Sequence, residues 1–432
     1  MKVQEHTLSN GLRILFIDTD AFPTLTTLLL VGAGSRYENE KNNGIAHFFE
    51  HMAFKGSKKY PNSFVIASTI EGLGGIFNAF TSKDHTGYWI KSTNEHFETV
   101  TDVLSDMVLH SALAEEEIER EKGVITEEIN LYEDTPYRRV NELFEGLLYK
   151  GNPLGFEIAG TKDTVRTFDR ATFTNYMDAL YKPENAVLVV AGGLNKIKSL
   201  ELRIKNYIDI IEEKFSKWKK GEKGSFNRVV ENQKEPQILI KNKKTEQVHF
   251  CLGFRAFSFR DKRKYALNLL SLLLGGGMSS RLFIEVRERR GLCYYISTGR
   301  ELYHDVGNIV TQAGVTSNPE KVKEAIRTIL QEHKKIIQGD VKIEELNRVK
   351  ELLKGRLLLS MEDSSNIASF FGTKLILEDK IQTPQDMIRE IESIKVADVT
   401  QLAGQIFRPE NLNLALIGNL TQNDISSKDL FI

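Results

Sequence analysis

The stretch PENAVLVVAGGL (residues 183–194) has a counterpart near the other end of the chain, PENLNLALIGNL (residues 409–420). Six of the twelve aligned positions are identical, which makes chance similarity between two buried strands a poor explanation. In both stretches an apolar run follows Pro-Glu-Asn and ends at a glycine. The pattern predicts that the chain repeats one architecture twice, each copy ending on a buried strand.

Ser216 to Glu235, between the two stretches, is rich in Lys, Glu, Gly and Ser and poor in apolar residues. This composition is typical of a solvated linker. We therefore expect a first domain at residues 1–215, a linker at 216–235 and a second domain at 236–432. The expected fold class is α+β, with two similar domains, each a mostly antiparallel sheet packed with helices.

Composition narrows the possible functions. The chain has 432 residues, of which 41% are hydrophobic and 27% charged, as in ordinary globular proteins. Lys plus Arg (58) nearly equals Asp plus Glu (59), so the charge gives no indication of nucleic-acid or membrane-surface binding. Cys251 and Cys293 are too few for a disulfide framework or a four-cysteine zinc site. No signal-peptide pattern or long apolar run is seen, so we expect a cytoplasmic protein.

Local patterns predict the main elements of the first domain. Asn10-Gly11 suits a hairpin with a type I′ turn, because this pair best tolerates two positive φ angles. Gly75 to Ser92 is rich in the Thr, Tyr, Trp and Ile of strands. Helical patterns cover residues 43–54, 99–113 and 115–132.

The segment His47-Phe48-Phe49-Glu50-His51 carries the clearest chemical signal. Residues four apart share one face of a helix, so His47 and His51 can present both imidazoles to one cation. Glu50 points toward the same face and could accept a proton from water there. This H-x-x-E-H order is the inverted form of the commoner zinc motif. The apolar residues around the motif favour a buried helix, in which His and Glu need partners.

A catalytic zinc site generally needs a third protein ligand. Residues 115–132 contain seven glutamates, most of which would simply be solvated. Glu121 and Glu128 lie two helical turns apart on one face. Periodicity does not single them out, so the residues alone leave the third ligand open.

These segments together resemble the inverzincin family, which includes pitrilysin, insulin-degrading enzyme and mitochondrial processing peptidase. In that family a liganding glutamate follows the motif at a set spacing, and Glu128 follows His51 at that same spacing. The resemblance implies that His47, His51 and Glu128 bind one Zn²⁺ per chain. It also implies that Glu121 supports catalysis without being a primary ligand. Under the repeat, His47 corresponds to a position within Leu270 to Leu274, which has no histidine, so we expect the second copy to lack metal ligands.

The segment GGIFNAFTS (residues 74–82) resembles the family strand beside the metal. The edge of that strand holds an extended peptide through main-chain hydrogen bonds. By this resemblance Asn78 and Ala79 would contact substrate. The neighbouring Asp84 and His85 have no ligand role in the family, and we expect them to be structural or on the surface.

The segment GGGMSSRLF (residues 275–283) lacks the arrangement of a phosphate-binding loop. It resembles the family helix and loop that carry an Arg and, seven residues later, a Tyr, which here are Arg287 and Tyr294. The resemblance implies that both bind the substrate backbone and that the Tyr294 hydroxyl acts in catalysis by stabilising the oxyanion. Taken without the resemblance, a surface arginine and a core tyrosine remain the alternative.

We therefore expect a zinc metalloendopeptidase that hydrolyses peptides or unfolded polypeptides, with Glu50 as general base. The alternative is a non-catalytic structural or peptide-binding subunit of the same fold, which the presence of every expected ligand and of Glu50 disfavours. The chain length resembles the two-domain branch of the family, which works as dimers. That resemblance implies a clamshell homodimer in which Arg287 and Tyr294 complete the partner's zinc site.

Overall fold

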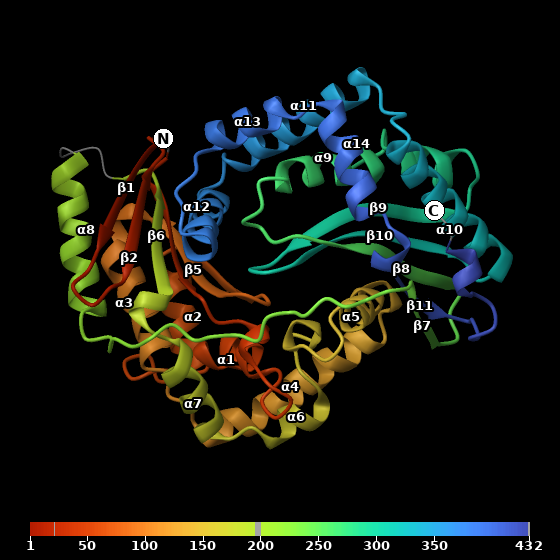
Figure 1. Cartoon of the computed structure of the whole chain (residues 1–432). Coiled ribbons are helices and arrows are strands. Elements are labelled where there is room, and N and C mark those ends of the chain that lie inside the picture. The colour runs from red at the N-terminus through yellow and green to blue at the C-terminus, as the bar shows by residue number, and fades with distance from the viewer. Residues whose placement is uncertain (21, 195–199, 431–432) are drawn as a thin grey trace. The chain divides into compact units, whose positions relative to one another are not determined.

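Two β-sheets organise the computed structural model, which describes residues 1–20, 22–194 and 200–430 (Figure 1). In these residues the first sheet has six strands in the order β1-β2-β6-β3-β5-β4. Their bounds are Lys2–Thr7 (β1), Arg13–Asp18 (β2), Thr24–Val31 (β3), Ile76–Thr81 (β4), Thr86–Thr93 (β5) and Ala186–Gly192 (β6). Only the β2–β6 pairing is parallel; every other neighbouring pair is antiparallel.

The second sheet repeats this topology. Over the described residues it has five strands in the order β7-β11-β8-β10-β9, and its one parallel pairing is β7–β11. The bounds are Gln237–Asn242 (β7), Gln247–Ala256 (β8), Cys293–Leu302 (β9), Gly307–Thr316 (β10) and Leu412–Gly418 (β11). β6 and β11 are the repeated apolar runs, and each lies inside its sheet with every residue buried. The predicted α+β class with two similar, mostly antiparallel sheets is confirmed.

Helices lie in both halves of the chain. In the first half of the chain they are α1 (Ile45–Ala53), α2 (Ser63–Gly72), α3 (Phe97–Leu109), α4 (Glu115–Glu133), α5 (Pro136–Leu148), α6 (Lys162–Thr167), α7 (Arg170–Leu180) and α8 (Leu200–Phe215). In the second half they are α9 (Lys264–Gly275), the π-helix η5 (Phe283–Glu288), α10 (Pro319–Ile337), α11 (Ile343–Ser360), α12 (Ser364–Glu378), α13 (Pro384–Ser393) and α14 (Val396–Ile406). Helices α7 and α14 precede β6 and β11 at the same interval in the two halves, as the repeat predicts.

The chain divides into two compact units that exchange a helix. The first unit comprises Met1–Ile129, Phe156–Asn227 and Leu358–Thr383, and the second comprises Asn130–Gly155, Arg228–Leu357 and Pro384–Ile432. Helix α5, from the first half of the chain, therefore belongs to the second unit, and α12, from the second half, belongs to the first. The domain boundaries expected from the sequence were contiguous and did not include this exchange. They were placed from the composition of the linker, and composition does not indicate which sheet a helix covers.

Each exchanged helix covers one face of the sheet in its unit. Helix α12 lies against the first sheet (Figure 1). Its Ile367, Phe371 and Leu375 are buried with residues of β2, β3 and β6. Gly372 lies so close to the first sheet that a Cβ atom would come within 2.6 Å of Leu30 Cδ1. On α5, Val140, Phe144 and Leu148 are buried with residues of β8 and β11. The two sheets are thus completed by equivalent helices taken from opposite halves of the chain.

The predicted hairpin at Asn10-Gly11 is confirmed, but its turn type is not. β1 and β2 pair antiparallel across a loop from Leu8 to Leu12. Gly11 has a φ of +94°, whereas Asn10 is not among the described residues with positive φ. The Asn10 side chain donates to Phe215 O (2.8 Å) and accepts from Leu12 N (3.1 Å). These two hydrogen bonds hold Asn10 in a wider loop than a type I′ turn.

Residues 216–235 have no helix or strand, but they are not uniformly solvated. The Trp218 indole donates to Tyr181 O (2.9 Å). The Arg36 guanidinium stacks on the Phe226 ring at 3.8 Å from its centroid. The beginning of this segment is therefore fixed on the first unit, through contacts that its composition did not reveal. Across the described ranges, no helix combines the length and apolar character needed to cross a bilayer.

The helix exchange leads to a stability prediction. Phe371→Ala should lower the free energy of unfolding by about 3–5 kcal/mol. Phe371 is 1% exposed, so removing its ring leaves a cavity in the core. Leu359→Ala, at a residue 67% exposed, should change it by no more than about 0.5 kcal/mol. Urea unfolding measures both.

Hydrogen exchange locates the effect of Phe371→Ala. Amides of β3 and β6 should lose protection, although Phe371 lies far from them in sequence. Loss confined to the strands of the second sheet would contradict the assignment of α12 to the first unit.

Candidate metal centre

Helix α1 positions three polar side chains by burying nearly all the others. Phe48 makes an edge contact with Phe173 (ring centroids 5.0 Å apart), and Phe49 makes one with Tyr181 (5.0 Å). The remaining apolar residues of α1 are also buried. His47 and His51, one turn apart, therefore share the helix face that is left, with ring centroids 4.7 Å apart.

The buried carboxyl group of Glu38 fixes the first turn of α1. Glu38, 3% exposed, accepts hydrogen bonds from Ala46 N (2.8 Å), Gly44 N (2.8 Å) and Asn43 Nδ2 (2.9 Å). Burial raises the pKa of Glu38 to about 8, and the hydrogen bond from Ala46 opposes that shift. Two of these donors are backbone N–H groups at the start of the helix, which lack intrahelical partners. Glu38 therefore sets where α1 begins and how it is rotated.

Glu128, on α4, faces both histidines. Its Oε2 lies 3.6 Å from His47 Nε2 and 3.6 Å from His51 Nε2. One donor atom from each of the three residues lies within 4.8 Å of the others. Glu127, the adjacent residue, is exposed and is not part of this group. The structure thus brings together the three residues that the sequence predicted as metal ligands.

The donor set fits Zn²⁺. Two imidazole nitrogens and one carboxylate oxygen, with a fourth position left for water or substrate, is the usual composition of a catalytic zinc site. Burial and the neighbouring charge of His51 lower the pKa of His47 to about 4, against the opposing effect of Glu128. His47 is therefore neutral near pH 7, the form in which imidazole binds metals. In the described ranges no other group of His, Cys, Asp and Glu converges in this way.

Glu50 lies beside the cluster and is held by Thr81, the last residue of β4. Thr81 Oγ1 donates to Glu50 Oε2 at 2.6 Å, which leaves Oε1 free of that bond. Burial raises the pKa of Glu50, and the hydrogen bond from Thr81 opposes the shift. A carboxylate with a raised pKa is a better proton acceptor. The sequence analysis missed Thr81, because a threonine at the end of a strand carries no signal of its own.

Glu121 contacts the ring nitrogen of His51 that does not face Glu128. His51 Nδ1 lies 2.9 Å from Glu121 Oε1, and Lys55 Nζ lies 2.6 Å from Glu121 Oε2. Burial alone would raise the pKa of Glu121, but its bonds to His51 and Lys55 lower it overall. An ionised Glu121 favours the proton on His51 Nδ1 and leaves Nε2 free to bind a cation. Lys55 was also missed, although its position one turn after His51 places it near the same face.

The other residues singled out in the first half lie on β4 and in the turn between β4 and β5. Asn78 is exposed and Ala79 is half-buried on β4, which pairs only with β5 among the described strands. Asp84 is buried in an ion pair with Arg36 (3.0 Å), and His85 Nδ1 contacts Ser82 Oγ (2.9 Å). Neither belongs to the group of candidate ligands.

Arg287 and Tyr294 lie together in the second unit. The Arg287 guanidinium is 5.8 Å from the centroid of the Tyr294 ring and 4.6 Å from that of Phe283. Tyr294 is 75% exposed, which excludes the alternative of a core tyrosine. Both side chains are therefore available to a ligand of the second unit.

Comparisons with known proteins agree with this fold. Residues 13–162 match the family described as Insulinase (Peptidase family M16), and residues 167–353 match the one described as Peptidase M16 inactive domain. A crystal structure of a protease from Helicobacter pylori has a TM-score of 0.88 at 23% identity, over 96% of this chain and 99% of that one. A Pseudomonas fluorescens structure described as a peptidase M16 inactive domain has a TM-score of 0.87 at 18% identity, over 98% and 99%. The fold is thus of the M16 peptidase class.

Sequence relatives extend over the same length. A Bacillus subtilis protein named an uncharacterized zinc protease is 34% identical over 96% of this chain and 98% of its own. A Rickettsia bellii protein with the same description is also 34% identical, over 93% and 94%. The chain belongs to the insulinase family, Peptidase family M16.

The geometry predicts unequal roles for two adjacent glutamates. Glu128→Gln should weaken Zn²⁺ binding by more than about 100-fold. That is the upper end of the losses seen when a residue that hydrogen-bonds a metal ligand is changed, and a ligand itself should matter more. Glu127→Gln should leave it unchanged, because that side chain points to solvent. Competition with a chromogenic chelator measures both affinities. Equal affinities would remove Glu128 from the donor set.

Proposed function

We propose that this chain is a zinc-dependent metalloendopeptidase that hydrolyses peptides or unfolded polypeptides held in extended conformation. The observation that carries the proposal is the convergence of His47, His51 and Glu128 beside Glu50. The full-length relatives named zinc proteases support it. A bound Zn²⁺ would supply the Lewis acidity that polarises the scissile carbonyl and makes the attacking water easier to deprotonate.

Glu50 is the general base of this proposal. Thr81 occupies Oε2 of Glu50, so Oε1 would take the proton of the attacking water and then return it to the leaving amine. Proton transfer of this kind contributes about 10²- to 10⁴-fold to the rate. The hydrogen bond from Thr81 also fixes the orientation of the Glu50 carboxylate, so Oε1 keeps one position relative to the metal ligands.

Substrate contacts come from main-chain and side-chain groups. The open edge of β4, at Asn78 and Ala79, would pair with an extended peptide through backbone hydrogen bonds. Arg287 and Tyr294 would bind the peptide backbone, and the Tyr294 hydroxyl would stabilise the developing oxyanion. An extended peptide can form hydrogen bonds with the unpaired backbone groups at the edge of β4. A folded chain already uses its backbone groups in its own hydrogen bonds. Peptides and unfolded polypeptides are therefore favoured as substrates.

A non-catalytic binding subunit of the same fold is the competing function. Such a protein needs the edge of β4 but has no use for a base beside the metal ligands. Here Glu50 is half-buried and its carboxylate is oriented by Thr81, at a cost in desolvation that a binding role does not offset. The position of Glu50 therefore favours catalysis.

Glu50→Gln separates these functions. The variant should bind Zn²⁺ as the wild type does, because both imidazoles and Glu128 remain, and should lose about 10²-fold or more of its peptide hydrolysis. Zinc content and cleavage of a quenched peptide mixture are the measurements, with Glu127→Gln as the matched control. Near-normal turnover would remove Glu50 from the mechanism. A zinc-loaded wild type that cleaves no peptide would favour the binding subunit.

We further propose that the protein works as a homodimer, with Arg287 and Tyr294 acting on the zinc site of the partner. The metal cluster belongs to the first compact unit and the Arg287–Tyr294 pair to the second. A site that needs both could be completed within one chain or between two chains. The two-domain members that this chain resembles favour completion between chains.

A mixing experiment tests completion between chains. Glu50→Gln and Tyr294→Phe should each be weak alone. In a mixed dimer, one of the two sites would combine an intact Glu50 with an intact Tyr294. Since random exchange makes about half of the dimers mixed, activity should recover to roughly a quarter of the wild type by two-fold symmetry. No recovery, with subunit exchange shown by two affinity tags, would mean that each chain completes its own site.

A further inference from the structure

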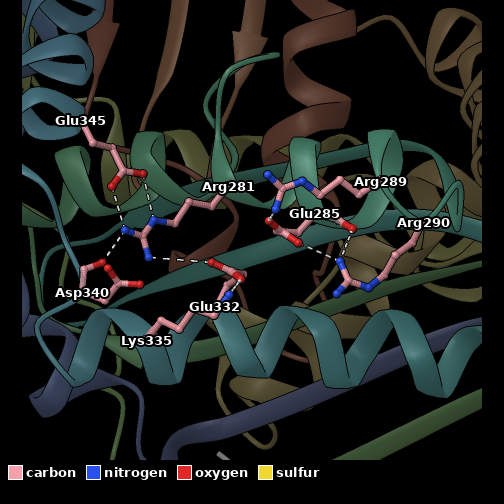
Figure 2. Close-up of polar contacts among 8 residues, drawn as sticks. All are labelled: Arg281, Glu285, Arg289, Arg290, Glu332, Lys335, Asp340 and Glu345. Carbon is pink, nitrogen blue, oxygen red and sulfur yellow. Dashed lines mark hydrogen bonds and ion pairs between the residues drawn. The ribbon is translucent and has the colours of Figure 1, made fainter.

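Arg281 is the centre of a charged network in the second unit (Figure 2). It lies between the end of α9 and the start of η5. Its Nε and Nη2 form a fork with Glu345, at 2.8 Å to Oε1 and 2.7 Å to Oε2. Nη2 also donates to the backbone oxygen of Asp340, and Nη1 lies 3.7 Å from Glu332 Oε2. One guanidinium therefore joins the start of η5 to α10 and α11.

The network is shielded from solvent. The side chains of Arg281, Glu332 and Glu345 are only 12%, 5% and 15% exposed. Lys335 Nζ lies 2.6 Å from Glu332 Oε1, so Glu332 is shared between two cations. Fork-shaped pairs of this kind fix direction as well as distance. A partly buried ion pair is costly to break but is weak evidence for stability, so its geometry is the more informative property.

Helix α11 also holds the glycine-rich turn before Arg281. Arg356 Nη2 donates to Gly276 O at 2.8 Å, and Arg348 Nη2 donates to Ser279 O at 3.4 Å. Together with Glu345, these side chains place three contacts from one helix along residues 276–281. The start of η5 is thus fixed to α11 and has little freedom to slide.

The segment fixed in this way carries Arg287 and leads to Tyr294. η5 is a π-helix, a form that is rare and that often occurs at functional sites. Gly291 N donates to Arg287 O (3.0 Å) and Leu292 N to Val286 O (3.0 Å), which joins η5 to the beginning of β9. In the part of the chain that the structure describes, no carboxylate lies within ion-pair distance of Arg287. A shift of η5 would therefore move Arg287 and Tyr294 together.

The first half of the chain has a similar link at the metal site. There Lys55, which follows α1, pairs with Glu121 on α4, the helix whose place in the first half corresponds to that of α11 in the second. Glu121 in turn holds His51. In both halves a cation after a helix is paired with an acid on the corresponding later helix, next to residues that the proposed function uses.

We propose that Arg281 is a positioning residue, whose forked ion pair with Glu345 holds η5 so that Arg287 and Tyr294 meet the peptide backbone of the substrate. The inference rests on the proposed function, because it assigns Arg281 a role in binding the substrate of that same site. Arg281 itself, held by three acceptor groups, does not contact the substrate.

Arg281→Lys is the variant that tests this role, because it keeps the charge in the network and loses the fork. It should raise KM for a short peptide by about tenfold with kcat changed by less than about twofold, as expected when binding shared by ground and transition state is lost. Zinc content and melting temperature should stay close to the wild type. Arg289→Lys is the matched control, since Arg289 also pairs with an acid, Glu285, but is 67% exposed. It should change neither constant.

Two further measurements distinguish positioning from general stability. In an Arg287→Gln background, Arg281→Lys should raise KM by no more than about twofold, because coupled residues are not additive. In a zinc-loaded Glu50→Gln background, Arg281→Lys should weaken binding of a fluorescent peptide by about the same tenfold, measured by anisotropy without turnover.

The outcomes separate this inference from the proposed function. Unchanged KM and unchanged peptide affinity in Arg281→Lys would overturn the positioning role while hydrolysis by the wild type stands. Full additivity with Arg287→Gln would also overturn it. A wild type that binds the peptide without hydrolysing it would overturn the proposed enzyme, and the anisotropy measurement would still decide whether Arg281 positions the binding residues.

Discussion

The rotation of α1 about its own axis is the constraint on which the metal site depends. Consecutive residues of a helix point about 100° apart, so His47 and Phe48 cannot both face α4. Burial of Phe48 and Phe49 selects one rotation, and the three hydrogen bonds to Glu38 fix it at the first turn. A start displaced by one residue would turn an aromatic ring toward Glu128 and a histidine into the core.

The two halves use one scaffold for different tasks. In the first half, the face of α1 opposite the core holds the candidate metal ligands, and Lys55 and Glu121 stiffen it. In the second half, the corresponding region is apolar in α9 and continues into η5, where Arg281 fixes an arginine and a tyrosine. Under the proposed function, the first copy of the scaffold would bind the metal and the second would bind the substrate backbone. Both halves contain an ion pair to the corresponding later helix, Lys55 with Glu121 on α4 and Arg281 with Glu345 on α11.

Sequence reasoning reached two features directly from the residues: the repeat that begins at Pro183 and Pro409, and the helix face that His47 and His51 share. Glu128 came only from the resemblance to the family, because periodicity left the third ligand open among several glutamates. It did not reach Thr81, because the fold brings its partner Glu50 to it from a distant part of the sequence. It did not reach Glu38 either, although the partners of Glu38 are close in sequence, because a glutamate in a loop is normally solvated. It also missed the helix exchange. Helices α5 and α12 each bury one face, but an apolar face does not indicate which of two similar sheets it will cover.

The exchange of α5 and α12 has a consequence for synthesis on the ribosome. The last strand of the first sheet, β6, ends at Gly192, but the helix that covers one face of that sheet ends at Glu378. At roughly 5–20 residues per second, an interval of about ten to forty seconds separates the two. During this time Leu28, Leu30 and Val189 have no α12 to pack against. The nascent chain therefore presents a broad apolar surface to the chaperones that meet it, and elongation speed sets how long they must protect it.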